Sequence, residues 1–328
     1  MNYATKVEIP ESKVKFGYKD ELMLLGSCFA DEIGKKMVEY RFRACVNPFG
    51  ELYNPLSVAA ACRRLMSPVP FAIEDLVFYN GLYHSFMHHG RFSNVSQEAC
   101  LSMINDSLAD SAKRFPNLEF LMITFGTAYI YRLKKNGQVV ANCHKLPASD
   151  FSRNILTVNE IVEVYEDLLN EIRRVNRSMK IVFTVSPIRH LSDGAHGNLV
   201  SKSTLILAVQ ALVEKYPSQV FYFPAYELMM DELRDYRFYA ADMLHPSPVA
   251  VEYIWDRFCE TYLSASDKSI LKEVLDINKA LNHNSLNGNT DVYKQFLMQT
   301  MLKIKRLREK NPYICFPEEE KRITNSML

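Results

Sequence analysis

Three residues of this sequence have the types and the chain order of a nucleophile with its acid–base partners. Ser27 follows a short apolar run and opens a helical pattern, and Asp242 and His245 form an Asp-x-x-His pair. A serine hydroxyl becomes a useful nucleophile only when a neighbouring base takes its proton and a third group holds that base in the right tautomer. The spacing lets Asp242 reach one imidazole nitrogen while the other nitrogen faces Ser27. The three residues therefore predict acyl transfer through a covalent intermediate.

Two other interpretations of this turn stay open. Serine is among the best residues at a helix N-cap, so Ser27 could serve only to start its helix. Cys28 could be the nucleophile instead, because a helix N-terminus lowers the pKa of a thiol. Cys28 is the residue after the turn, however, and is expected to point into the core. Together with Asp242 and His245, the sequence favours Ser27.

Strand and helix patterns that could position these residues alternate along the chain. The buried strand patterns lie at 22–25, 41–46, 118–126, 181–185 and 220–223. The helical patterns lie after Pro55, from Thr157 to about 174, at about 199–216 and from Ser247 onward. This alternation predicts a parallel sheet covered by helices on both faces. Ser27, Thr127, Ser186 and the 240–247 loop then fall at the carboxyl ends of strands, where such sheets carry active sites.

Two hairpins and a C-terminal extension depart from this alternation. Asn80-Gly81 and Asn136-Gly137 each separate two strand patterns, and Asn-Gly favours a two-residue turn. The first hairpin and the helical stretch after it form an expected insertion at about 67–117. Because the composition changes near residue 263, we expect one domain at 1–262 and a helical extension at 263–328.

The extension contains two helical segments, at about 265–281 and 291–310, around a polar stretch. The second segment is basic and amphipathic; its basic residues are Lys303, Lys305, Arg306, Arg308 and Lys310. Such a helix could touch a membrane or an acidic partner. A helix docked on the core with a solvated basic face is the favoured interpretation.

The composition excludes several classes of protein. Apolar residues make up 48% of the 328 residues and the formal net charge is +1, so no global field gathers nucleic acid or an anionic membrane. No apolar run is long enough to span a bilayer, and the first residues do not resemble a signal peptide. The seven cysteines are scattered and lack C-x-x-C pairs. We expect reduced thiols in a cytoplasmic protein whose partner is a small molecule.

Several segments resemble the GSCFA family. They are Gly26-Ser27-Cys28-Phe29-Ala30, NPFGELYNP (47–55), TFGTAYIYR (124–132), NCHKLP (142–147), SPIRH (186–190) and DMLHPS (242–247). The resemblance covers roughly residues 20–260. The family is itself similar to the GDSL/SGNH hydrolases, which are esterases and lipases. The resemblance therefore implies a flavodoxin-like three-layer α/β/α fold and a serine hydrolase domain at 1–262.

The resemblance also implies an oxyanion hole. Ser27 would donate its backbone N–H, and Gly50 matches the glycine of the second block. The asparagine of the third block is replaced by Ala128, which has no donor. Asn142 on the next hairpin strand, or the hydroxyl of Thr127, could supply the missing hydrogen bond. Loss of one such donor typically lowers turnover by about 10²–10³-fold.

Further polar residues lie near the expected site. His144, Arg189 and His190 are candidate substrate-binding residues, since the last two follow a strand and suit an anionic or polyol substrate. Arg189 and Lys202 could equally pair with Asp193 or Asp150. Three more histidines, His84, His88 and His89, lie near the first hairpin. One of them could line the substrate cleft, but a surface cluster is the favoured expectation. No set of residues has the spacing of a metal site.

The favoured function is hydrolysis of a small acyl ester, with an O-acetylated carbohydrate as one substrate class suggested by the family resemblance. An acyltransferase would use the same residues with an alcohol in place of water. A non-catalytic binding protein on the same fold is the other alternative, motivated by Ala128. The chemistry needs no cofactor, and no phosphate-cradling or dinucleotide-binding glycine pattern is present. The oligomeric state stays open.

Overall fold

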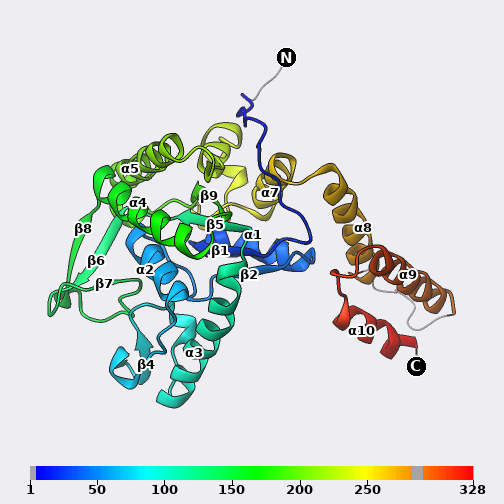
Figure 1. Ribbon diagram of the computed structural model, residues 1–328, viewed down its shortest axis with the longest axis horizontal. Helices are drawn as coiled ribbons and strands as arrows, with labels where there is room; N and C mark the ends of the chain where they lie inside the picture. Colours follow the sequence, from blue (N-terminus) through cyan, green and yellow to red (C-terminus); the bar gives the residue numbers. More distant parts are fainter. Residues whose placement is uncertain (1–4, 283–290, 328) are drawn as a thin grey trace.

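The computed structural model describes residues 5–282 and 291–327, and a five-stranded sheet lies at its centre (Figure 1). Its strands are β1 (Leu22–Gly26), β2 (Ala44–Val46), β5 (Phe120–Phe125), β9 (Lys180–Val185) and β10 (Val220–Tyr222). The order across the sheet is β2-β1-β5-β9-β10, and every neighbouring pair is parallel. The predicted parallel sheet is confirmed. The chain moves from β1 to β2 on one side and then to β5 on the other, so the strand order reverses direction between β1 and β5.

Side chains of the sheet alternate between two apolar clusters, as the pleat of a strand requires. Met23 and Leu25 of β1 belong to one cluster, and Leu22 and Leu24 belong to the other. The first cluster is covered by α2 (Pro55–Met66), α3 (Gln97–Arg114), α4 (Val158–Val175) and α5 (Gly194–Lys215). The second cluster is covered by α1 (Cys28–Glu39), the short α6 (Ala225–Glu227) and α7 (Pro248–Tyr262). The central domain therefore has three layers, α/β/α.

The helices begin at polar N-cap residues. Thr157 and Glu160 form the predicted capping box of α4, and Ser247 caps α7 ahead of Pro248. These local signals hold because each side-chain oxygen accepts a backbone N–H that the first turn leaves unpaired. Helix α5 begins at Gly194, earlier than the predicted start near 199. Two glycines in its first turn, which disfavour helix, hid that start in the sequence.

Two small antiparallel sheets flank the central one. The hairpin of β3 (Leu76–Tyr79) and β4 (Leu82–Ser85) turns at Asn80-Gly81 as predicted. The second sheet contains β6 (Tyr129–Leu133), β7 (Val139–Val140) and β8 (Phe151–Ile155) in the order β7-β6-β8. Strand β8 was not predicted. Most of its side chains are exposed, and its extended form depends on pairing with β6.

The C-terminal helices gather on one side of the molecule, away from both small sheets (Figure 1). They are α8 (Ala265–Asn282), α9 (Asp291–Lys310) and α10 (Pro317–Met327), and only α10 was not predicted. Ile304 and Leu307 of α9 are buried in the cluster that α1 and α7 share, as expected of a docked helix. The polar stretch at 283–290 lies outside the described residues. Across the part of the chain that is described, every helix is too short or too polar to cross a lipid bilayer.

Candidate active site

The loop after β1 is held in one conformation by its neighbours. Gly26 has a φ of +142°, and a Cβ atom there would lie 2.1 Å from the Thr124 carbonyl oxygen. The Gly26 N–H donates to Asn47 Oδ1 at 2.9 Å, and its carbonyl accepts the Leu52 N–H at 2.8 Å. Only glycine fits this close approach of two strands. The loop therefore presents the start of α1 at the switch in strand order, where ligands of such sheets bind.

Ser27 is the N-cap of α1 and is almost completely buried, with 1% of its surface exposed. Its hydroxyl oxygen accepts the Phe29 N–H at 3.3 Å. Its backbone N–H donates to the Thr124 carbonyl at 3.1 Å. Within the described residues, no hydrogen bond joins Ser27 to Asp242 or His245. The geometry of Ser27 is that of the capping residue considered above.

Cys28, the first residue of α1, is the side chain that meets the acid–base pair. Its Sγ lies 3.8 Å from Nε2 of His245, and His245 Nδ1 lies 2.6 Å from Asp242 Oδ2. Asp242 also accepts the backbone N–H groups of Leu244 and His245, at 2.9 and 3.0 Å. These hydrogen bonds lower the pKa of Asp242 to about 2, and the two backbone N–H groups make the largest contributions. The expected Asp242–His245 contact is present, but it faces a thiol.

The expectation that Cys28 points into the core is wrong. Cys28 is partly exposed and lines two cavities at the carboxyl edge of the sheet. Ser27 has extended backbone angles, with φ −70° and ψ 176°, whereas Cys28 begins the helix. The two side chains therefore leave the turn in different directions, so that Ser27 is buried and Cys28 is partly exposed.

The thiol of Cys28 is protonated at neutral pH. Burial raises the pKa of Cys28 to about 11, and the backbone N–H groups of Cys28 and Phe29 offset only part of this rise. A thiol in this state needs a base to become a nucleophile. His245 is positioned to be that base, because Asp242 fixes the proton on Nδ1 and leaves Nε2 as an acceptor.

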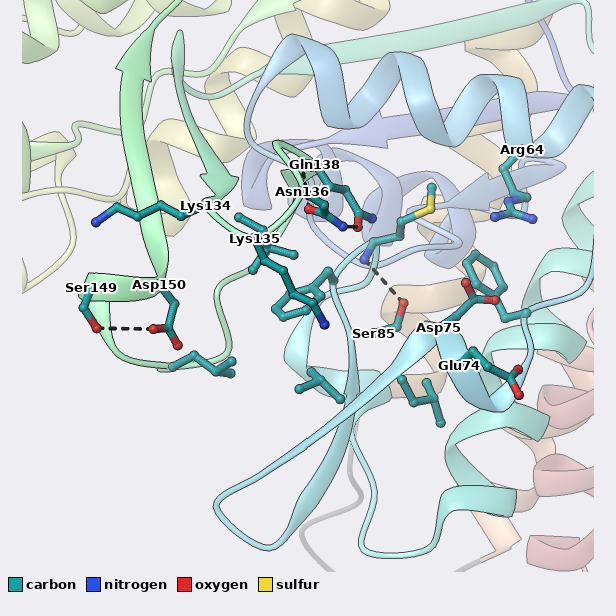
Figure 2. A pocket seen from close by; sticks show the side chains of 17 residues that line it. Arg64, Glu74, Asp75, Ser85, Lys134, Lys135, Asn136, Gln138, Ser149 and Asp150 are labelled. Carbon is teal, nitrogen blue, oxygen red and sulfur yellow. Dashed lines mark hydrogen bonds between the residues drawn. The ribbon is translucent and has the colours of Figure 1, made fainter.

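A cavity of about 430 Å³ opens over Cys28 and His245. Its walls include Tyr53, Asn54 and Thr127 from loops after the strands. A larger hollow of about 670 Å³ lies between the β3–β4 hairpin and the turn after β6, and Figure 2 shows its lining. The wall of that hollow contains both positively charged lysines and negatively charged carboxylates. It contains neither a cysteine nor a histidine. Of these two cavities, only the first combines a nucleophile with a base, and Cys28 and His245 also line a neighbouring cavity of about 600 Å³.

Of the expected oxyanion donors, the backbone N–H groups of Ser27 and Gly50 have other acceptors, and Asn142 lies outside the cavity. The Ser27 N–H donates to Thr124, and the Gly50 N–H donates to the Asn47 carbonyl at 2.8 Å. Asn142 uses its Oδ1 to accept the His144 N–H, and it does not line the cavity. Thr127 lines the cavity, but its hydroxyl lies 3.1 Å from Ser201 Oγ and accepts the Tyr129 N–H. Ala128 is buried, which is possible because its side chain has no polar group that would need a partner.

Asn54 is a donor that the sequence analysis missed. It caps α2 with Oδ1, which accepts the Ser57 N–H at 2.9 Å, and Nδ2 donates to Ser57 Oγ at 3.0 Å. One amide hydrogen remains, since a carboxamide carries two donors. Asn54-Pro55 is the same cap-and-proline pattern as Ser247-Pro248, and it could have marked this residue. The backbone N–H of Cys28, in the first turn of α1, has no intrahelical acceptor either.

Two family models match this chain. The model of the GSCFA family matches residues 21–258, and the model of the C-terminal domain of GSCFA domain proteins matches residues 274–328. The chain belongs to the GSCFA family. No curated protein matches this GSCFA protein.

Among solved structures, the GSCFA protein is similar to an acetyl xylan esterase (Est2A) from the rumen bacterium Butyrivibrio proteoclasticus. The identity is 11% and the TM-score is 0.37. The similarity covers 74% of this chain and 63% of that chain.

Lys202 of the GSCFA protein lies beneath the site and is fully buried. Its Nζ donates to the carbonyls of Gly126 and Ser186, both at 2.7 Å, at the ends of β5 and β9. Burial lowers the pKa of Lys202 to about 7. The suggested pairing of Lys202 with Asp193 or Asp150 is wrong, since Asp193 pairs with Arg153 and the Lys202 head group reaches carbonyls instead.

His190 and Arg189 of the GSCFA protein line the cavity, and their role in substrate binding stays a prediction. Burial lowers the pKa of His190 to about 4, so its imidazole is neutral at pH 7. Its Nε2 has no hydrogen-bond partner among the described residues. His144 lies outside this cavity, because its Nε2 is held 2.8 Å from the Ser85 carbonyl.

The expected surface cluster of histidines is wrong. His84 and His88 are buried, with 6% and 1% of their surfaces exposed. His84 stacks on His144 with ring centroids 4.5 Å apart, and His88 packs among phenylalanine rings. His89 pairs with Glu51. Within the described residues, no group of three histidines, cysteines or carboxylates is arranged to hold a metal ion.

Proposed function

We propose that this GSCFA protein transfers acyl groups from ester substrates through a thioester on Cys28, with His245 as the base and Asp242 as its orienting group. The observation that carries the proposal is the 3.8 Å contact between Cys28 Sγ and His245 Nε2, two residues that line the 430 Å³ cavity. The strand order, 2-1-3-4-5 counted along the chain, is that of flavodoxin-like sheets. It supports the resemblance to SGNH hydrolases stated from the sequence.

The mechanism has two halves. His245 Nε2 takes the thiol proton while Cys28 Sγ attacks the ester carbonyl, and Asp242 stabilises the imidazolium that forms. The C–O bond of the ester breaks, the leaving alkoxide takes the proton from His245, and an alcohol departs. A water molecule then gives its proton to His245 and attacks the thioester. The acid is released and the thiol regains its proton.

The tetrahedral oxyanion needs donors. The Cys28 N–H at the start of α1 is one, and the second amide hydrogen of Asn54 is the other. The neutral His190 supplies a third polar group in the wall. These three take the place of the donors that the resemblance implied at Ser27 and Gly50 and of the substitutes considered at Asn142 and Thr127.

Water and an alcohol are both suitable acceptors, so a hydrolase and an acyltransferase share this machinery. Tyr53, Tyr129 and Tyr131 in the wall give aromatic faces on which a sugar ring can stack, which fits the carbohydrate ester considered from the sequence.

The test is to locate the acyl group. We would incubate the wild-type protein with 4-nitrophenyl acetate, quench it in acid and map the acetylated peptide by mass spectrometry. We expect acetyl on Cys28 in the wild type and in Ser27→Ala, and none in Cys28→Ala. Ser27→Ala should lose about 1 kcal/mol of stability with its helix cap, so its folding is checked by circular dichroism. The exposed Cys315 serves as an internal standard, because His245→Ala should remove acetylation of Cys28 only.

A fluorophosphonate probe supplies the opposing outcome. If the probe labels Ser27, and Cys28→Ala keeps that label, the serine is the nucleophile and the cysteine proposal fails. If neither residue is modified in the folded protein, the site binds its ligand without covalent chemistry.

Asp242→Asn tests the orienting group. An amide cannot hold the imidazole in the same tautomer, so we expect turnover of 4-nitrophenyl acetate to fall by about 10²–10⁴-fold. Asp242 is well exposed, with 45% of its side chain accessible, so the melting temperature should stay nearly unchanged. A variant that keeps full turnover would show that Asp242 has no part in the reaction.

A further inference from the structure

Arg189 follows β9 and lies against the loop that carries Asp242 and His245. Its backbone N–H donates to the Leu244 carbonyl at 3.2 Å. Its guanidinium lies near the rings of Tyr236 and Tyr239, at 5.9 and 5.6 Å from their centroids. The only hydrogen bond recorded for its head group within the described residues is a long one, 3.5 Å to the Met243 carbonyl. The guanidinium is therefore held by aromatic rings while most of its donors stay unused.

The other charges near Arg189 have partners. Arg153 pairs with Asp193 in the wall of the catalytic cavity. On the neighbouring turn, Arg234 pairs with Asp231 and Arg237 pairs with Asp235. Across the described ranges, Arg189 has no carboxylate within 4.0 Å.

Arg189 lines two cavities at once. One is the catalytic cavity over Cys28, and the other is an adjoining pocket of about 270 Å³. The second pocket is mostly apolar, with Leu199, Met229 and Met230 in its wall. Arg189 is thus an unpaired cation at the junction between the nucleophile and an apolar pocket.

A half-buried guanidinium without a counter-ion favours an anionic ligand, and its planar fork matches the two oxygens of a carboxylate or phosphate. We infer that the substrate carries an oxyanion group that Arg189 binds, with an apolar portion entering the adjoining pocket. This inference rests on the proposed function, because it names the substrate class of the Cys28 site. It predicts an acidic ester in preference to a neutral one.

The first measurement compares two alkylating reagents of similar size. Iodoacetate is an anion and iodoacetamide is neutral, and both report on Cys28 by peptide mass spectrometry. At each cysteine we take the ratio of the iodoacetate rate to the iodoacetamide rate, and Cys315 of the same molecule gives the reference ratio. We expect the ratio at Cys28 to exceed the ratio at Cys315. Arg189→Gln should lower the ratio at Cys28 by about tenfold, the factor expected for loss of one charged hydrogen-bonded contact. Arg237→Gln, an exposed arginine with its own partner, should leave the ratio unchanged.

The second measurement needs no reactive thiol. We would record the melting temperature with inorganic phosphate, with succinate and with chloride at equal ionic strength. Stabilisation by phosphate or by succinate beyond chloride, lost in Arg189→Gln, supports the site, and the more effective ion tells a phosphate group from a carboxylate.

The two ideas fail separately. If Cys28 reacts with neither reagent while the anion effect on melting persists, the nucleophile proposal fails and the anion site stands. If Arg189→Gln changes neither the ratio nor the melting behaviour, the anion site is overturned, whatever Cys28 does.

Discussion

At the scale of single residues, the candidate site combines the protonated thiol of Cys28 with the buried amine of Lys202, whose charged form burial disfavours. Lys202 is enclosed beneath the cavity and donates to two carbonyls at strand ends. The thiol of Cys28 and the ammonium of Lys202 favour each other's charged form, while burial opposes both charges. The buried lysine therefore supports the thiolate at the moment it forms, and fixes the Gly126 and Ser186 turns that shape the cavity.

A pH-dependent stability difference tests Lys202. The folded-state pKa of about 7 lies below the unfolded value of 10.5, so the unfolded chain binds more protons between these values. Stability contributed by this residue therefore rises with pH across that window, by up to about 1.4 kcal/mol per pH unit. We expect the wild type to exceed Lys202→Met in free energy of unfolding by more at pH 9 than at pH 7. Urea denaturation at both pH values measures this, and a difference independent of pH would contradict a buried, neutralised lysine.

At the scale of elements, the site depends on how closely β1 approaches β5. Gly26 has the backbone conformation that L residues avoid, and its Cα faces the carbonyl of Thr124. Asn47 holds the same glycine from the other side through its side-chain oxygen. The turn that presents Cys28 is therefore fixed by contacts to the Gly26 backbone, and Cys28 lines the cavity.

Alanine substitution at two glycines with positive φ, Gly26 and Gly81, distinguishes the energetic cost of backbone strain from that of a close backbone contact. Gly26→Ala adds both the strain and a clash with backbone, so we expect it to cost roughly 3–5 kcal/mol. Gly81→Ala, in the turn of the β3–β4 hairpin, adds strain alone, because no atom lies within 4 Å of its Cβ position. We expect a cost of about 1–2 kcal/mol there. Equal losses in urea denaturation would show that the close approach to Thr124 has no energetic weight.

At the scale of the whole molecule, the C-terminal helices and the sheet share one apolar cluster. Phe316, ahead of α10, and Leu307 of α9 are buried in the same cluster as Trp255 of α7. Arg41, after α1, pairs with Glu319 of α10. The extension expected at 263–328 is thus packed on the face of the sheet that α1 and α7 cover.

Trp255 is the single tryptophan and reports on this shared cluster. Phe316→Ala removes a buried ring, which should cost about 3–5 kcal/mol. We expect the urea midpoint followed by Trp255 fluorescence to fall together with that followed by circular dichroism. Val292→Ala is the control, since Val292 is 76% exposed. If the tryptophan transition of Phe316→Ala stayed at the wild-type midpoint, the extension would be unfolding as an independent unit.

The sequence by itself determined the local and periodic features of this protein. Alternation of apolar runs with amphipathic stretches predicted the parallel sheet and most helices, because burial on both faces requires that pattern. Asp242 and His245 were recognisable as a pair, since only two residues lie between them and their contact is local. The caps at Thr157 and Ser247 were visible for the same reason.

Only the tertiary structure decided which side chains face one another. Ser27 and Cys28 both suit a nucleophile, and the choice between them depends on how the start of α1 is rotated against the loop of His245. Strand β8 exists through its pairing with β6, and Asn54 reaches the cavity through the approach of Tyr53 to Gly126. The burial of Lys202 likewise depends on two strands and a helix that lie far apart in the chain. These contacts join residues of high sequence separation, so no local pattern of residue types encodes them.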